Sequence, residues 1–211
     1  MGRARTVTSD QRRSKRRRLR RQAAVLIFLM VAFGLAWFFE SQATTTVIFT
    51  RYADIDRSQG DNPGLSPAGQ ARAQELARVL GDVDVVAGVD AIFANQYRST
   101  QETAEPLARR LHLQVQVVDV KDISGLLEHI LKDWKGKVVL VITHTEPLPV
   151  LIQELHGSKK LPPMAADEYD NLYVVSIPWY GKVKTLRLKY GAPYLPPPAI
   201  PAANPPAAGA G

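Results

Sequence analysis

The chain has 211 residues, no cysteine and a formal net charge of +7. This length accommodates one domain with additional segments, and the composition is that of a globular protein rather than a disordered one. The absence of cysteine excludes disulfide bonds and thiolate chemistry.

Most of the positive charge lies in the first 21 residues. They hold ten Lys or Arg side chains and one acid, Asp10, so this tail carries +9 and the rest of the chain carries −2. A mildly acidic domain does not attract nucleic acid, so we expect no nucleic-acid partner for it. Contact of the basic tail itself with anionic lipid or nucleic acid stays open.

An uncharged apolar segment follows this tail at residues 23–39. As a helix it spans about 25 Å, which suffices for a membrane when flanking arginines reach outward. Cations before the segment and Trp37, Phe38 and Phe39 at its end predict a cytoplasmic amino terminus. We therefore expect residues 1–21 to be cytoplasmic and residues 22–39 to be a single-pass anchor in contact with lipid. The membrane would be a bacterial inner membrane, and the following domain periplasmic or extracytoplasmic.

A secretory signal peptide has the same arrangement, and Ser41-Gln42-Ala43 resembles a cleavage site. The apolar stretch is longer than a usual signal core and ends in bulky aromatic residues, which favours the anchor. A buried helix is disfavoured because no polar face alternates with the apolar residues.

In the remaining chain, β-branched and aromatic runs alternate with helical patterns. Ser66 and Pro67 suit the start of a helix, and Gly81 its end. Strands are predicted at 46–50, 90–94, 113–118, 137–142, 171–177 and 183–188. Helices are predicted at 67–80, around 103–111, at 123–131, and from Pro147 through Leu155.

This alternation predicts an α/β fold of three layers, a mostly parallel sheet with helices on both faces. The last two strands are expected to form an antiparallel hairpin around Trp179-Tyr180-Gly181. Residues 191–211 are rich in Pro and Ala and uncharged, which predicts a disordered tail. The domain is therefore expected at residues 40–190.

The first strand ends in Arg51-Tyr52-Ala53, and Gly64-Leu-Ser-Pro-Ala-Gly69 begins the next helix. These segments resemble the opening of the histidine phosphatase superfamily, the phosphoglycerate-mutase-like fold. There a strand ends in Arg-His-Gly or Arg-His-Ala, and Leu-Ser/Thr-Pro-x-Gly begins the helix. Further resemblance in the same order lies at residues 90–93, 103–108, 138–144 and 168–175. It covers about residues 45–191 and implies a phosphate site at the carboxyl ends of the strands.

In that family a neutral histidine attacks a phosphoryl group, and two arginines with a second histidine bind its oxygens. Here Arg51 matches the first arginine, and Tyr52 stands at the position of the nucleophile. Imidazole offers a free lone pair at neutral pH, whereas a phenol has a pKa near 10 and needs a base. We expect Tyr52 to fill the pocket, with its oxygen about where the phosphate would lie.

By ungapped alignment the second arginine falls on Ser99. Arg98 comes one residue earlier, which on a helix rotates a side chain by about 100°. Arg98 is thus expected to point elsewhere, although its length leaves it a candidate for substrate binding. His144 matches the second histidine, and Glu146 places a carboxylate beside the expected phosphate site. The candidate binding residues are Arg51, Arg98, His144 and Glu146, and no residue is assigned as catalytic.

These substitutions predict a domain that has lost the phosphohistidine mechanism and acts by binding, as a pseudoenzyme. Its partner would be a phosphorylated small molecule or a protein. The alternative is a working phosphatase that uses Tyr52 or His144 on an unusual substrate, and a mainly structural envelope protein stays open. The sequence has no glycine-rich phosphate loop and no metal-ligand spacing among its four histidines, so we expect no cofactor and no metal.

Overall fold

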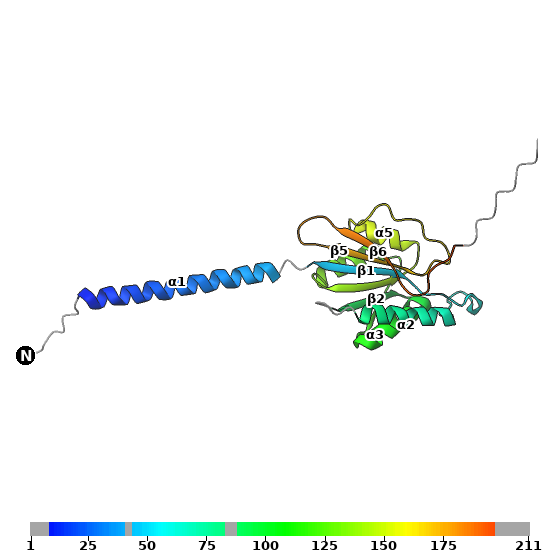
Figure 1. Cartoon of the computed structure of the whole chain (residues 1–211), viewed down its shortest axis with the longest axis horizontal. Coiled ribbons are helices and arrows are strands. Elements are labelled where there is room, and N and C mark those ends of the chain that lie inside the picture. Colours follow the sequence, from blue (N-terminus) through cyan, green and yellow to red (C-terminus); the bar gives the residue numbers. More distant parts are fainter. Residues whose placement is uncertain (1–8, 41–43, 83–87, 197–211) are drawn as a thin grey trace, which may run out of the picture.

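The computed structural model describes residues 9–40, 44–82 and 88–196. A long helix, α1 (Ser9–Glu40), projects from an α/β unit that begins at Thr45 (Figure 1). The expectations for residues 1–8 of the basic tail and 197–211 of the carboxyl-terminal tail lie outside the described residues.

Helix α1 contains a stretch that is long and apolar enough to cross a membrane. Arg18–Phe38 has 21 residues with a mean hydropathy of 1.8, and none of it is buried in the protein. Large side chains such as Phe28, Met30 and Phe33 are each 70% exposed. By length and composition, therefore, this helix is a candidate membrane span.

The sheet contains six strands in the order β3-β2-β4-β1-β5-β6. The strands β1, β2, β3 and β4 are parallel to one another, and β5 and β6 are antiparallel neighbours at one edge. The predicted α/β class and the terminal hairpin are confirmed. The strands are β1 (Thr45–Arg51), β2 (Ala91–Asn95), β3 (Val115–Val118), β4 (Val138–Thr143), β5 (Asn171–Ile177) and β6 (Lys184–Lys189).

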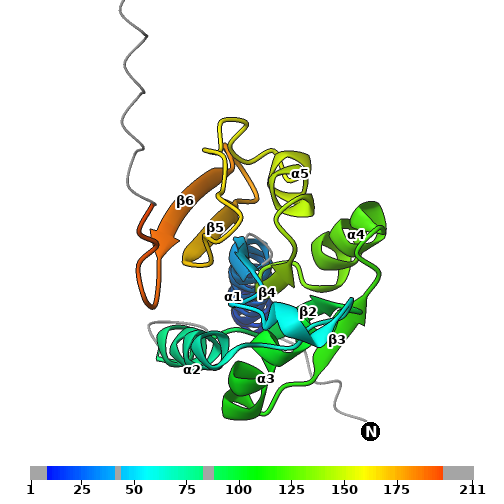
Figure 2. The ribbon, with the colours of Figure 1, turned by 90° about the vertical axis from the view of Figure 1, so that its right-hand side faces the viewer.

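Four helices cover the two faces of the sheet (Figure 2). The helices α2 (Pro67–Gly81) and α3 (Arg98–Leu111) pack on one face, and α4 (Ile123–Asp133) and α5 (Pro147–Glu154) pack on the other. Alternation along β1 explains this: Val47 and Phe49 join the core under α4 and α5, whereas Ile48 joins the core under α2 and α3. The expected three layers are thus present.

The segment after β1 is held tightly against α2 and α3. A short 3-10 helix, η1 (Arg57–Gln59), interrupts it. The Ser66 side chain accepts from the backbone N–H of Gly69 at 3.1 Å and so caps α2. A Cβ atom on Gly69 would lie 2.0 Å from the carbonyl oxygen of Asp54, so only glycine permits this approach. On α3, the Thr103 hydroxyl accepts from the backbone N–H of Ala53 at 3.0 Å.

Because β1, β2 and β4 are parallel, their carboxyl ends all lie at the same end of the sheet. Arg51 is paired with Thr143 in register, and Asn95 ends β2 on the other side of β4. The start of β1, the turn between β5 and β6, and the end of α1 lie at the other end of the strands (Figure 1). The candidate site and the candidate membrane helix therefore lie at opposite ends of the strands.

The chain beyond β6 remains bound to the domain for several residues. Arg72 donates to the carbonyl oxygen of Ala192 at 2.9 Å, and the backbone N–H of Tyr194 donates to the Asp170 carboxylate at 2.9 Å. These contacts extend past the expected domain boundary at residue 190, because the side chains of α2 and of the loop before β5 reach polar backbone groups there.

Candidate functional site

Arg51, the last residue of β1, is the centre of the site and is only 5% exposed. Its Nη2 donates to the Tyr52 hydroxyl at 3.0 Å, and its Nη1 donates to the carbonyl oxygens of Ala165 and Glu168 at 3.3 and 3.4 Å. Its guanidinium carbon lies 4.3 Å from the ring centroid of Tyr169 and 4.8 Å from that of Tyr52. Only Nε is buried without a hydrogen-bond partner. The guanidinium is therefore enclosed by neutral groups.

The loop before β5 supplies the carbonyl oxygens that bind Arg51. Its shape is fixed by the Glu168 carboxylate, which accepts from the backbone N–H of Ala165 at 3.0 Å, from Asn171 at 2.8 Å and from Lys189 at 2.6 Å. Burial opposes the charge, but these bonds prevail and lower the pKa of Glu168 to about 2. The loop is thus held by an ionised carboxylate at all ordinary pH values.

His144 follows the last residue of β4 and lies between two tyrosine rings. Its ring centroid is 4.9 Å from that of Tyr52 and 4.9 Å from that of Tyr97, with interplanar angles of 62° and 65°. Burial lowers the pKa of His144 below its ordinary value of 6.5, the nearby Glu146 carboxylate raises it, and Arg51 lowers it. The net direction is downward, so His144 is neutral at pH 7.

Asn95, the last residue of β2, determines which nitrogen of His144 carries the proton. Its Oδ1 accepts from the backbone N–H of Tyr97 at 3.0 Å and from the Thr100 hydroxyl at 2.7 Å. The amide NH2 must then face His144, whose Nδ1 lies 2.8 Å from Nδ2. Nδ1 accepts this bond, which leaves the proton on Nε2. In this tautomer, neither nitrogen has a free lone pair for nucleophilic attack.

Of the residues singled out in the sequence, Arg51, Tyr52 and His144 are brought together, and Ser99 lies on the neighbouring face of α3. Ser99 is 4% exposed and one helical turn before Thr103, whose hydroxyl binds Ala53 beside Tyr52. Ser99 therefore lies on the buried side of α3, and its match to the second arginine of the family stays a prediction.

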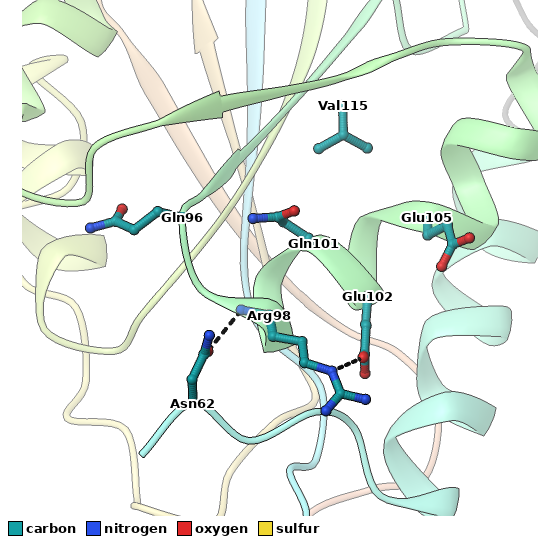
Figure 3. Close-up of a pocket in the computed structure, with 7 residues that line it drawn as sticks. All are labelled: Asn62, Gln96, Arg98, Gln101, Glu102, Glu105 and Val115. Atoms are coloured by element: carbon teal, nitrogen blue, oxygen red, sulfur yellow. Dashed lines mark hydrogen bonds and ion pairs between the residues drawn. The ribbon is translucent and has the colours of Figure 1, made fainter. Parts of the chain in front are cut away.

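Arg98 does not join this group. Its Nε donates to Glu102 at 2.5 Å and its Nη1 to Gln59 at 3.0 Å, while its backbone N–H donates to Asn62 at 3.0 Å. Figure 3 shows the side chain extending along α3 toward Glu102, in a surface pocket also lined by Gln96, Gln101, Glu105 and Val115. The expectation that Arg98 could bind the same ligand as Arg51 is not supported by this geometry, because its charge is paired one turn along its own helix.

Glu146 begins α5 as its N-cap residue, is exposed, and makes no side-chain capping bond. Its carboxylate is near enough to His144 to affect the pKa of the imidazole. The site therefore combines one enclosed cation, a neutral imidazole and a free carboxylate. Within the described residues, no group of three or more His, Cys, Asp or Glu is placed to hold a metal ion.

Three further residues of the site, Asn95, Tyr97 and Tyr169, were not singled out from the sequence. Asn95 carries the same signal as Arg51, a polar residue directly at the end of a buried strand. Tyr97 and Tyr169 lie in loops, where no periodicity marks them. We refer to Arg51, Tyr52, Asn95, Tyr97, His144 and Tyr169 together as the strand-end cluster.

The role of Asn95 predicts the effect of Asn95→Asp. A carboxylate keeps the bonds from Tyr97 and Thr100 but accepts from His144 instead of donating, so the proton moves to Nδ1 and the pKa of His144 rises above 6.5. In the parent, the contribution of His144 to the free energy of unfolding is complete above pH 6.5 and falls as the pH drops below it. In the variant the sign reverses, and the contribution is lost as the pH rises through the new pKa.

Nitrogen chemical shifts of the imidazoles, recorded against pH, check both the tautomer and the direction of the pKa shift. The exposed His112 and His156 provide internal references. A parent spectrum with the proton on Nδ1 of His144 would show that the assigned orientation of Asn95 is wrong.

By sequence the chain matches no protein-family model and no curated protein. By structure it is similar to the protein histidine phosphatase SixA in complex with tungstate, at a TM-score of 0.56 and 20% identity over 68% of this chain and 96% of that one. It is also similar to the putative phosphohistidine phosphatase SixA from Nakamurella multipartitia. The TM-score is 0.55 and the sequence identity 18%, over 71% of this chain and 98% of that one.

A third similar structure is the mycobacterial glucosyl-3-phosphoglycerate phosphatase in complex with inorganic phosphate, at a TM-score of 0.51 and 17% identity over 70% of this chain and 97% of that one. The similarity covers nearly the whole of each of these proteins and 68–71% of this chain. The chain therefore has the fold of the histidine phosphatases.

Proposed function

We propose that this protein is a membrane-anchored, extracytoplasmic domain with the histidine phosphatase fold that has lost the phosphohistidine mechanism and acts by binding. One observation carries the proposal: the Tyr52 hydroxyl accepts a hydrogen bond at 3.0 Å from the guanidinium of Arg51, a residue that is only 5% exposed. The guanidinium N–H that would bind a phosphoryl oxygen is therefore already used in the bond to Tyr52.

The remaining groups of the strand-end cluster supply no substitute nucleophile. His144 carries its proton on Nε2 and offers its Nδ1 lone pair to Asn95, and freeing it would break the bond from Tyr97 to Asn95. A tyrosine nucleophile would need a base to take its proton. The imidazole of His144 contacts Tyr52 through an edge-to-face ring packing, with an interplanar angle of 62°, and not through a hydrogen bond to its hydroxyl. The geometry therefore supports the binding role over the alternative of a working phosphatase.

The charge of the site also disfavours a phosphate dianion. Relative to the family pattern, one cation is missing at Ser99, and Glu146 adds one anion. Two charge units at a few Å, with an effective dielectric constant near 20, amount to several kcal/mol against binding. Two of the three similar structures hold tungstate or inorganic phosphate, whereas this site favours a neutral ligand group or a protein surface rich in hydrogen-bonding groups.

The placement of the domain follows from the charges around α1. Ten Lys or Arg side chains precede the uncharged segment 23–39, and few cations follow it closely. The positive-inside rule then places the amino terminus in the cytoplasm of a bacterial cell and the α/β unit on the other side of the inner membrane.

The loss of chemistry predicts that the purified full chain releases no phosphate from a generic aryl phosphate above the level of a His144→Ala variant. It should also form no acid-labile phosphohistidine. Colorimetric turnover and acid-lability of any incorporated label check this. Turnover that Tyr52→Phe abolishes would instead establish a tyrosine nucleophile and exclude the pseudoenzyme.

Restoring the residues of the family at three positions should let the site bind an oxyanion. Tyr52→His, Ser99→Arg and Glu146→Asn together restore the lone pair, the second guanidinium and the charge balance. The triple variant should bind orthovanadate, and at one hundred times the dissociation constant this adds about 2.7 kcal/mol to the free energy of unfolding. Thermal unfolding with and without orthovanadate measures it.

The three single variants are the controls for this repair, and each should gain little because the groups act together. If the folded triple variant binds no oxyanion while the parent does, the alignment of these positions with the family's site is incorrect.

The proposed topology can be tested with two reporters fused after Gly211, one that is active only in the periplasm and one that fluoresces only in the cytoplasm. We expect the alkaline phosphatase fusion to be active and the fluorescent-protein fusion to show no fluorescence. The opposite pair would place the domain in the cytoplasm. The mass of the mature chain distinguishes an anchor from a cleaved signal peptide, since cleavage after Ala43 removes α1.

A further inference from the structure

The turn between β5 and β6 carries two large aromatic side chains that the core does not use. Trp179 is 52% exposed and Tyr180 is 86% exposed, and their rings lie 6.2 Å apart. Gly181 follows with a φ of +115°, a conformation that favours glycine and turns the chain back into β6. We refer to residues 178–183 as the aromatic turn. Exposing two such rings is costly for a surface that faces only water.

The aromatic turn lies beside the end of the candidate membrane helix. The rings of Phe38 and Trp179 meet edge to face, with centroids 5.8 Å apart and an interplanar angle of 80°. Phe38 is the last residue of the apolar stretch Arg18–Phe38. Both features are at the same end of the sheet, because Thr45 at the start of β1 pairs with Ile177 at the end of β5 (Figure 1). The turn is thus at the depth where α1 would leave the hydrocarbon of a bilayer.

The surroundings of the aromatic turn are basic. Residues 177–188 contain no Asp or Glu, and both Lys182 and Lys184 are exposed. A second loop adds the exposed Lys159 and Lys160. It is held next to β6 by the backbone N–H of Ser158, which donates to the Thr185 hydroxyl at 2.9 Å. Aromatic rings together with lysines are typical of surfaces that lie in the headgroup region of anionic membranes.

We propose that the aromatic turn, together with Lys159 and Lys160, docks onto the anionic phospholipid headgroups of the bilayer that α1 enters. This inference rests on the proposed anchoring by α1 and adds a second contact between the domain and the membrane. Because α1 already holds the turn at the surface, its local lipid concentration is high and a weak intrinsic affinity suffices. The contact fixes the orientation of the domain relative to the membrane.

Tryptophan quenching by brominated lipids tests this in the full chain reconstituted into vesicles of phosphatidylcholine and phosphatidylglycerol. The chain has three tryptophans, Trp37, Trp134 and Trp179. In a Trp37→Phe variant only Trp179 and Trp134 emit, and Trp134 packs against the domain core with its indole N–H buried. We expect lipids brominated near the headgroup to quench part of the emission and lipids brominated deep in the chains to quench less. Adding Trp179→Phe should abolish this quenching.

Lysine variants test the choice of headgroup. Lys182→Gln with Lys184→Gln should reduce the quenching in anionic vesicles. The matched pair Arg57→Gln with Lys121→Gln, two exposed cations at the opposite end of the strands, should leave it unchanged. Equal quenching in pure phosphatidylcholine vesicles would overturn the assignment to anionic lipid.

Flotation of the vesicles separates failure of this inference from failure of the anchor. If the chain does not float with the vesicles, the proposed anchoring is wrong, and the docking with it. If it floats but shallow bromines leave Trp179 unquenched, the anchor stands and the docking is overturned. A blue-shifted Trp179 emission without quenching would also overturn the docking, because it would place the turn against protein, such as a second copy of this chain, instead of lipid.

Discussion

The enclosure of Arg51 is the constraint on which the arrangement of the site depends. The charge of Arg51, a residue that is only 5% exposed, must be compensated, because an unpaired buried charge is very costly. Here the compensation comes from two carbonyl oxygens, one hydroxyl and two aromatic faces rather than from a carboxylate. The unpartnered Nε adds a cost of about 1–3 kcal/mol, so the stability of the domain elsewhere must offset it.

Each neighbour of Arg51 is fixed in turn by this requirement. Tyr52 must keep its hydroxyl on the guanidinium, and its ring then packs against His144. His144 is thereby desolvated, and Asn95 holds it in a single tautomer. On the other side, the Glu168 carboxylate holds the loop whose carbonyl oxygens bind Arg51. The cluster is therefore a continuous network rather than an open anion site, which is the physical basis of the proposed binding role.

Much of the fold could be predicted from the sequence, because most strands are apolar runs and the helices of the α/β unit carry apolar residues at helical spacing. The start of α3 at Arg98, before the predicted 103, was missed because its N-cap residue Tyr97 makes no side-chain capping bond. The Ser66-Pro67 start and the apolar run 138–142 both appear in the structure at the expected places. The site was harder, since Tyr97 and Tyr169 come from loops with no periodic pattern. The tautomer of His144 could not be predicted either, because it depends on which way the Asn95 amide faces, and that is decided by a backbone N–H at Tyr97.

The direction of β1 has a consequence for what can reach the site. The strand leads away from α1, and the six steps from Thr45 to Arg51, at about 3.3 Å each, place Arg51 roughly 20 Å from Thr45 along the strand. With α1 in a bilayer, a lipid headgroup cannot enter the strand-end cluster without leaving the membrane. In the proposed topology, a ligand of this cluster comes from the aqueous space or from a structure at that distance from the membrane surface. The proposed binding site would then face the layer beyond the membrane.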